Sequence, residues 1–384
     1  MTNQHATIQR ENPLSRQPFP EWQDWRWQLS RAVRSLTQFS DIPAAKGWLE
    51  SLTLRERQGL DRVLNAYQMG ITPYYLSLIE TYDPLDPVFA QIVPRAAEET
   101  ITPDELEDPI GDDNRELHTR PEQTITHRYR DRVLFHPTPM CAVYCRYCFR
   151  KRLVGQAAFT PNPTDIENGL AYIAAHPEIR EVIFTGGDPL LLTDKRLVTL
   201  LQRVAVIDHI SHLRIHTRLP VVNPFRISTA LAEGFSSLGK PLRIVTHFNH
   251  AVEVTKTAVQ AIRKLVERGI PVLNQSVLLK GVNADADCLE GLMLKLITHG
   301  IQPYYIHHPD KVRGTGHFRI SVARGRDIYR ELSARLPGHA LPRYVLDIPG
   351  GYGKIPMDGD HVIPLGNGKY RLINLQGVQR EYED

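Results

Sequence analysis

The stretch Glu181-Val-Ile-Phe-Thr-Gly-Gly-Asp-Pro189 joins a short apolar run to a glycine turn. An apolar run bounded by turn residues predicts a buried strand, here over Glu181–Thr185. The same pattern predicts five more strands, at Val133–His136, Leu213–Thr217, Leu242–His247, Val272–Leu278 and Gln302–His307. Amphipathic stretches between and after these runs predict helices near 165–176, 194–205, 226–238, 253–268, 286–299 and 322–335.

Six strand–helix units in succession indicate an α/β fold with a parallel sheet. Such repetition favours a complete or partial barrel. In a barrel of this kind, functional groups gather at the carboxyl ends of the strands. We therefore expect the site residues in the loops that follow the predicted strands.

Three regions are expected along the chain. Helical apolar spacing runs from Trp22 to Ile79, so residues 1–125 are interpreted as an N-terminal helical region and linker. The linker, from Asp83 to Gln123, is rich in Asp, Glu and Pro, which predicts loops that wrap the next domain. Residues 126–340 form the barrel. Residues 341–384 form a C-terminal segment with a glycine-rich loop and a hairpin near 364–369.

The composition is that of an ordinary globular protein. Of 384 residues, 42% are hydrophobic and 23% are charged, with a formal net charge of +3. This balance calls for neither nucleic acid nor a membrane surface as partner. The polar first twenty residues lack the apolar core of a signal peptide, and we expect a cytoplasmic protein.

Three of the four cysteines lie within the segment Cys141-Ala-Val-Tyr-Cys145-Arg-Tyr-Cys148. Three thiolates on a [4Fe–4S] cluster leave one iron open, and S-adenosylmethionine (SAM) can bind to that iron. Structural zinc is the alternative, but it requires a fourth ligand, and Cys288 is distant in sequence. The spacing favours the cluster over zinc and over three buried structural cysteines.

The glycine turn supports this interpretation. Gly186, Gly187 and Asp188 end the second predicted strand, where a backbone without side chains lets the methionyl end of SAM come close. By itself, Gly-Gly-Asp-Pro is only a good turn sequence. Because it follows the cysteine segment in the chain, the Gly-Gly-Asp-Pro turn predicts a SAM contact.

Together with four further segments, these motifs closely resemble the lysine 2,3-aminomutase family. The four are Thr126-His-Arg-Tyr-Arg-Asp-Arg132, Thr246-His-Phe-Asn-His250, Leu273-Asn-Gln-Ser-Val-Leu-Leu-Lys-Gly-Val-Asn283 and Asp347-Ile-Pro-Gly-Gly-Tyr-Gly-Lys354. The resemblance runs from about Trp22 to near the C-terminus. It implies a partial (β/α)6 radical SAM barrel with the cluster, SAM and pyridoxal 5′-phosphate (PLP) as cofactors.

The resemblance also implies roles for individual residues. Lys354 is the catalytic lysine that holds PLP covalently, and the preceding glycines leave its backbone free to approach the cofactor. Arg150 holds the substrate carboxylate, and Asp310 with Asp347 receives the distal ammonium of lysine. The remaining cofactor contacts are Arg128, Tyr129 and Arg132 near the PLP phosphate, and His247 and Gln275 near SAM.

The implied activity is that of an isomerase. It moves the α-amino group of L-lysine to the β-carbon, through a PLP imine and a 5′-deoxyadenosyl radical. An electron donor such as flavodoxin or ferredoxin is the implied partner. The relatives' C-terminal zinc cysteines are absent after Cys288, so the homo-oligomeric state stays open.

Four alternatives remain at this stage. An aminomutase that serves elongation factor P and an arginine 2,3-aminomutase share the scaffold. A radical SAM enzyme without PLP is the third alternative. A non-catalytic barrel is the fourth, and the three cysteines, Gly-Gly-Asp-Pro and Lys354 argue against it.

Overall fold

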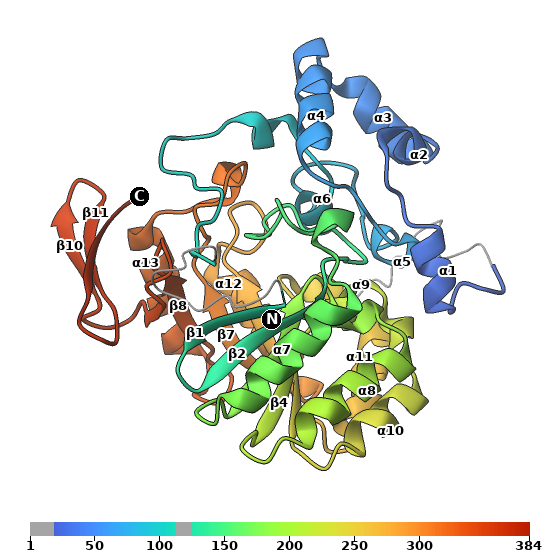
Figure 1. The fold of residues 1–384 in the computed structure, drawn as a ribbon. Coiled ribbons are helices and arrows are strands. Elements are labelled where there is room, and N and C mark those ends of the chain that lie inside the picture. Colours follow the sequence, from blue (N-terminus) through green and yellow to red (C-terminus); the bar gives the residue numbers. More distant parts are fainter. Residues whose placement is uncertain (1–18, 113–123) are drawn as a thin grey trace, which may run out of the picture.

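The structure is a computed structural model, and it describes residues 19–112 and 124–384. Its centre is a nine-stranded sheet in which the strands follow one another in sequence order (Figure 1). The strands are β1 (Ile125–Tyr129), β2 (Arg132–Thr138), β3 (Glu181–Gly186), β4 (His212–His216), β5 (Leu242–Thr246), β6 (Val272–Val277), β7 (Ile301–His307), β8 (Arg343–Asp347) and β9 (Lys354–Pro356).

The six predicted strand–helix units are confirmed. Strands β2 to β8 pair in parallel, and a helix follows each strand from β2 to β7. Each helix begins at a Ser, Thr, Asn or Asp whose side chain accepts a backbone N–H of the first turn. These helices are α7 (Pro163–Ala175), α8 (Asp194–Ala205), α10 (Thr229–Ser236), α11 (Lys256–Val266), α12 (Ala286–Thr298) and α13 (Val322–Arg335).

Burial alternates along the strands. In β4, Leu213 and Ile215 are fully buried, while Arg214 and His216 are partly buried. Successive strand residues point to opposite faces, so one face packs on apolar side chains and the other is polar. The Arg214 guanidinium pairs with Glu181 of β3 at 2.6 Å. The polar face of the sheet therefore carries buried charges that pair with one another.

The sheet is a partial barrel with two antiparallel edges. Strand β1 pairs with β2, and β9 pairs with β8. The Lys354 backbone N–H in β9 donates to the Tyr129 hydroxyl in β1 at 3.3 Å. This side-chain hydrogen bond links the two edges. Strands β8 and β9 lie in the segment 341–384, beyond the six strands that the sequence pattern predicts.

The N-terminal region is helical, as predicted, and stands beside the barrel (Figure 1). Its elements are α1 (Trp25–Ser30), α2 (Leu36–Ser40), α3 (Pro43–Ser51), α4 (Leu54–Ala66) and α5 (Pro73–Leu76).

The prediction of a loop-dominated linker is wrong for part of that segment. Helix α6 (Pro87–Ile92) starts at the Asp86 cap with Pro87 in its first turn, and Val88, Phe89 and Ile92 are completely buried. Asp and Pro indicated a loop, but both residue types also begin helices. The expected wrapping does occur, since Leu106 bridges to Val312. Residues 113–123 of the predicted linker lie outside the described residues.

The predicted C-terminal hairpin is confirmed and gains a third strand. Strands β10 (Val362–Gly366), β11 (Lys369–Ile373) and β12 (Gln379–Glu383) form a separate antiparallel sheet. Asn367 and Gly368 both have positive φ, 52° and 74°, as the tight turn requires. This sheet lies on the side of the barrel away from α1 (Figure 1).

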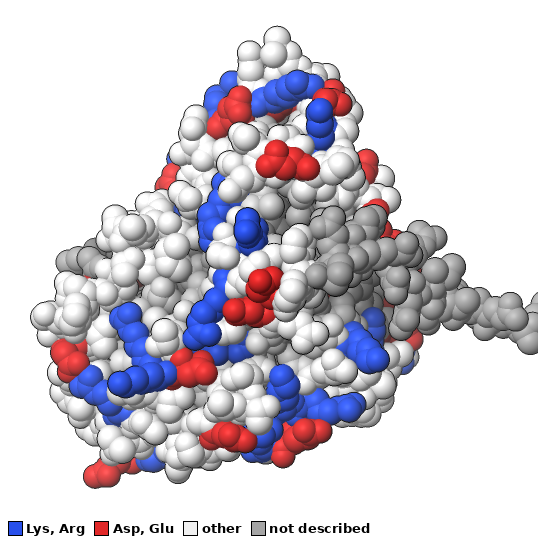
Figure 2. Space-filling view, turned by 90° about the vertical axis from the view of Figure 1, so that its right-hand side faces the viewer, with Lys and Arg blue, Asp and Glu red and all other residues white. Residues whose placement is uncertain are grey.

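Charges of both signs are interspersed on the face shown in Figure 2. No helix in the described ranges is long and apolar enough to cross a membrane.

Candidate active site

The cysteine segment follows β2 and is fastened to the glycine turn after β3. The Gly187 N–H donates to the Thr138 carbonyl and the Asp188 N–H to the Met140 carbonyl, both at 2.8 Å. A β-carbon on Gly187 would lie 2.3 Å from the Met140 oxygen, so only glycine allows this approach. The two motifs that the sequence singled out are thus in direct contact.

The three cysteine thiols lie near one another. Burial, with the neighbouring Cys145 adding to it, raises the pKa of Cys148 to about 12. Burial also raises the pKa of Cys141, with Asp188, Cys148 and Cys145 adding to the effect. Cys141 and Cys148 are therefore neutral without a metal to stabilise their anions. In the described part of the chain, no three His, Cys, Asp or Glu side chains are already arranged as a metal site.

The cysteine segment is also held by buried ion pairs. Glu98 accepts from Arg146 at 2.6 Å and from Lys151 at 2.9 Å. Burial alone would raise the pKa of Glu98, but the two cations lower it to about 2. A run of basic residues such as Arg146 and Lys151 is usually solvated. The structure shows instead that they tie the segment to the preceding linker.

Asp188 fastens the loops at the barrel mouth. Its carboxylate accepts from the Thr217 hydroxyl at 2.7 Å, the Arg218 N–H at 2.8 Å and the Leu190 N–H at 3.1 Å. Burial raises its pKa, and these hydrogen bonds oppose the rise. The predicted SAM residue thus joins the ends of β3 and β4.

His247 and Gln275 contact each other at the carboxyl ends of β5 and β6. A hydrogen bond joins their side-chain nitrogens. Burial, with Arg218 and His307 adding to it, lowers the pKa of His247 to about 3. The imidazole is therefore neutral at physiological pH, and the pair lies where the strand pattern predicted.

Asp112 joins two of the predicted site arginines. Its carboxylate accepts from Arg128 at 2.9 Å and from Arg150 at 2.7 Å. Burial would raise the pKa of Asp112, but Arg150 and Arg128 lower it to about 2. No sequence pattern indicated Asp112, since it lies in an acidic stretch that predicted loops. Asp112, Arg150 and Gly186 line one cavity.

A second group of charges surrounds Lys354. The Lys354 Nζ lies 2.8 and 2.7 Å from the two carboxylate oxygens of Asp347. His307 Nδ1 lies 3.6 Å from the same carboxylate. Burial would raise the pKa of Asp347, but Lys354 and His307 lower it. Burial and the charge of Asp347 raise the pKa of Asp310 to about 8, so Asp310 is the protonated member of the acid pair near neutral pH.

The glycine loop before Lys354 packs closely on neighbouring backbone. Gly350, Gly351 and Gly353 have φ values of 84°, 98° and 90°, a region that favours glycine. The Gly350 N–H donates to the Pro109 carbonyl at 3.1 Å. This packing brings Lys354 to the barrel edge at Tyr129.

Arg132 lies somewhat apart from these groups. Its guanidinium stacks over the Tyr129 ring at 4.8 Å and pairs with Asp131 at 3.0 Å. Its side chain is 40% exposed, against 13% for Arg128. Of the two arginines predicted near the PLP phosphate, only Arg128 joins the buried cluster with Asp112 and Arg150.

The fold and the cysteine segment define a radical SAM protein. The family model described as "Radical SAM superfamily" matches residues 135–290, which span the segment and the glycine turn.

Similar proteins specify the family. An L-lysine 2,3-aminomutase of Methanococcus maripaludis is 38% identical, covering 94% of this chain and 81% of that protein. The L-lysine 2,3-aminomutase of Bacillus subtilis is also 38% identical, covering 96% and 75%. The glutamate 2,3-aminomutase of Clostridioides difficile is 34% identical, covering 95% and 83%.

The chain belongs to the lysine 2,3-aminomutase family, and the predicted resemblance is confirmed. It is an isomerase of the radical SAM superfamily. Its cofactors are a [4Fe–4S] cluster, SAM and PLP. The residues gathered at the barrel mouth fit these groups: three adjacent thiols, a backbone cradle at Gly187, and a lysine among glycines.

Proposed function

We propose that this enzyme converts L-lysine to L-β-lysine by moving the α-amino group to the β-carbon. The observation that carries the proposal is the pair of acids, Asp310 and Asp347, which lie around a single cation, the Nζ of Lys354. The pair suits a substrate with a distal cation and would repel a side-chain carboxylate. It therefore favours lysine over glutamate, although a glutamate 2,3-aminomutase is among the similar proteins.

Arg150 receives the substrate carboxylate in this proposal. Its Nε and Nη2 both donate to one oxygen of Asp112, at 3.1 and 2.7 Å. The guanidinium is thus already arranged for an anion, and Arg150 is largely buried. A substrate carboxylate would take the place of Asp112 and leave that acid to Arg128.

Lys354 is the proposed catalytic residue, and it would hold PLP. The cluster and SAM supply a radical that removes hydrogen, and PLP allows an amino group to shift between adjacent carbons. Asp347 keeps the Lys354 ammonium charged in the cofactor-free chain, since it raises the pKa of Lys354 against the effect of burial. Arg128 and Tyr129, with Arg132 beside them, would hold the phosphate. The SAM contacts in this proposal are Gly186, Gly187, Asp188, His247 and Gln275.

A guanidinium would also pair with two acids, so arginine is the second candidate substrate. The aminomutase activity that serves elongation factor P is the third candidate. We further propose a cytoplasmic location and reduction by a flavodoxin or ferredoxin. We also propose that the protein forms a homo-oligomer.

The proposal is tested by product analysis. The anaerobically reconstituted protein is incubated with SAM, PLP and dithionite, in parallel with L-lysine, L-arginine and L-glutamate. We expect a β-amino acid from lysine, detected by mass spectrometry after derivatisation. A β-amino acid from glutamate and none from lysine would overturn the roles of Asp310 and Asp347.

The acid pair is tested with a matched variant. Asp310→Asn keeps the shape of the side chain and removes the carboxyl group that could ionise beside the ammonium of bound lysine, and we expect a higher KM for lysine. Asp327→Asn, an exposed acid on α13, serves as control and should leave KM unchanged.

A further inference from the structure

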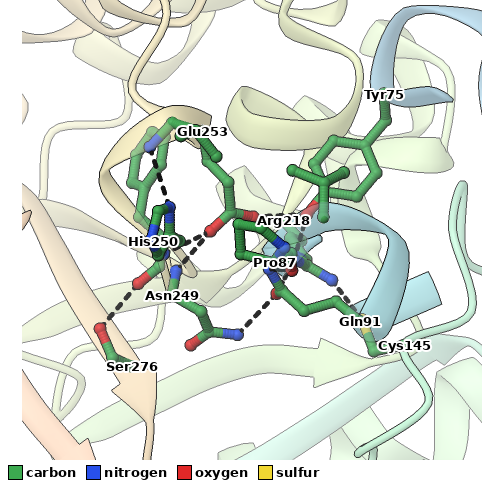
Figure 3. Close-up of polar contacts among 12 residues, drawn as sticks. Tyr75, Pro87, Gln91, Cys145, Arg218, Asn249, His250, Glu253 and Ser276 are labelled. Atoms are coloured by element: carbon green, nitrogen blue, oxygen red, sulfur yellow. Dashed lines mark hydrogen bonds and ion pairs between the residues drawn. The ribbon is translucent and has the colours of Figure 1, made fainter. Parts of the chain in front are cut away.

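Arg218 lies at the carboxyl end of β4, directly behind the cysteine segment (Figure 3). It is 9% exposed, and the proposed function assigns it no role. A buried arginine needs partners for its charge and its N–H groups. Its partners connect it to the cluster site.

One arm of the guanidinium reaches a predicted cluster ligand. Arg218 Nη1 donates to Cys145 Sγ at 2.8 Å. The other terminal nitrogen, Nη2, donates to the Tyr75 hydroxyl at 2.7 Å and to Gln91 Oε1 at 2.6 Å. Tyr75 belongs to α5 and Gln91 to α6, so the N-terminal helices help to hold the arginine.

The position of Arg218 is fixed from several sides. Glu253 pairs with Nη2 at 2.9 Å, and this acid is itself held by the backbone N–H groups of Asn249 and His250 at 2.6 and 2.7 Å. The Tyr75 and Tyr147 rings lie 5.1 and 5.6 Å from the guanidinium carbon. Figure 3 shows Tyr75, Gln91 and Glu253 around the guanidinium. Such a site is preorganised and needs no rearrangement when charge appears beside it.

A fixed N–H donor to a cluster sulfur changes the cluster's redox balance. A [4Fe–4S] cluster gains one negative charge when it accepts one electron. Hydrogen bonds to sulfur and nearby positive charge favour that reduced form and raise the reduction potential. Burial strengthens the effect because water does not screen it.

We propose that Arg218 is a positioning residue that raises the reduction potential of the cluster through its contact with Cys145. One electron passes from a low-potential donor, such as a reduced flavodoxin or ferredoxin, to the cluster, and no other bond changes in this step. The proposal rests on the assignment of Cys141, Cys145 and Cys148 as cluster ligands. Glu253 has the opposite effect in this arrangement, since its negative charge opposes the added electron.

The test is a redox titration of the reconstituted protein, followed by electron paramagnetic resonance. Arg218→Gln removes the positive charge of the side chain. Arg218→Lys keeps the charge but loses the planar guanidinium with its two terminal N–H donor groups. We expect Arg218→Gln to favour the oxidised cluster by at least tenfold, a potential lower by about 59 mV for one electron. Arg218→Lys should give a smaller shift of the same sign. Glu253→Gln should shift the potential upward.

Arg226 provides the matched control. It is a fully buried arginine in the same β4–β5 connection, and it donates to the Leu190 and Leu192 carbonyls. Arg226→Lys should leave the potential unchanged. An unchanged potential in both Arg218 variants, with full iron and sulfide content, would overturn the proposal. Folded Arg218 variants that bind no cluster would also overturn it, because Arg218 would then hold the cluster rather than tune it.

Two further results keep the test decisive. If the Arg218 variants do not fold, the test rests on Glu253→Gln. A reduction potential of the cluster that does not rise in this variant contradicts the proposal. Cys145→Ala separates this inference from the ligand assignment. A normal cluster in Cys145→Ala would show that the assignment itself is wrong, whatever Arg218 does.

Discussion

At the scale of single residues, the site is built from charges whose partners come from distant parts of the chain. Asp112 bridges Arg128 and Arg150, and Asp347 binds Lys354. In each case a buried carboxylate is stabilised by cations that can also bind an incoming group. This arrangement keeps the arginines and the lysine oriented before substrate or cofactor binds.

The role of Lys354 leads to a prediction about the two chromophores. Lys354→Ala should keep the iron–sulfur absorbance and lose the PLP absorbance together with turnover, because the cofactor then has no covalent attachment point. Ultraviolet–visible spectra of the reconstituted protein check this. Lys369→Ala, in the C-terminal sheet, serves as control. Normal PLP binding and activity in Lys354→Ala would refute the assignment.

The acid pair leads to a prediction about pH. The pKa of Asp310 is raised to about 8 by burial and by Asp347, whereas in an unfolded chain it is about 4. The folded state therefore binds more protons between these values, and the contribution of Asp310 to the free energy of unfolding falls as the pH rises from about 4 to about 8. Asp310→Asn should thus raise the Tm of the cofactor-free protein by a few degrees at pH 8, and by less at pH 5.

Differential scanning fluorimetry of parent and variant at both pH values measures this difference. Asp327→Asn, the same exposed control as above, should show no pH-dependent gain. An equal gain for Asp310→Asn at pH 5 and pH 8 would show that its charge is not the cause.

At the scale of elements, short helices outside the barrel support the site from behind. Helix α6 supplies Gln91 to Arg218, and Phe89 on the same helix packs edge-on against Trp48 at 4.9 Å between ring centroids. The N-terminal region thus shares one core with the barrel. The linker interpretation missed this because composition reports solvent preference on average and does not report which face of a short helix is covered.

Packing of α6 can be tested by stability. Phe89→Ala should lower the free energy of unfolding by about 3–5 kcal/mol, since it leaves a cavity in a fully buried position. Chemical denaturation followed by circular dichroism measures the loss. Leu85→Ala, two residues before the helix and 83% exposed, should have almost no effect. Equal effects of the two variants would mean that α6 is not packed as the structure shows.

At the scale of the whole molecule, the barrel is open between β1 and β9, and the proposed PLP lysine lies on the open edge. The Tyr129 hydroxyl links this edge to β1. In the proposed function, cofactor and substrate would therefore lie where the sheet has no strand-to-strand pairing, between the loops of both edges.

Tyr129→Phe tests this link. It removes one hydrogen bond, a net loss of about 0.5–1.5 kcal/mol, so the Lys354 amide should exchange about 2- to 10-fold faster in the cofactor-free protein. Hydrogen exchange with mass spectrometry measures this, with peptides of β3 as the internal reference. Unchanged exchange at β9 would show that the link does not hold the edge.

The sequence alone predicts the strand–helix repeat, the cysteine segment and Lys354 after its glycines. Each depends on spacing along the chain: burial on a strand or helix repeats locally, and thiols three or four residues apart lie near one another in one loop. Three features appear only in the folded chain: Asp112 contacts Arg150 across 38 residues, Arg218 contacts Cys145 across 73, and α6 is buried. The partner of a buried charge is the group that the fold brings next to it. Because that group can lie anywhere in the sequence, the pattern of neighbouring residues does not predict it.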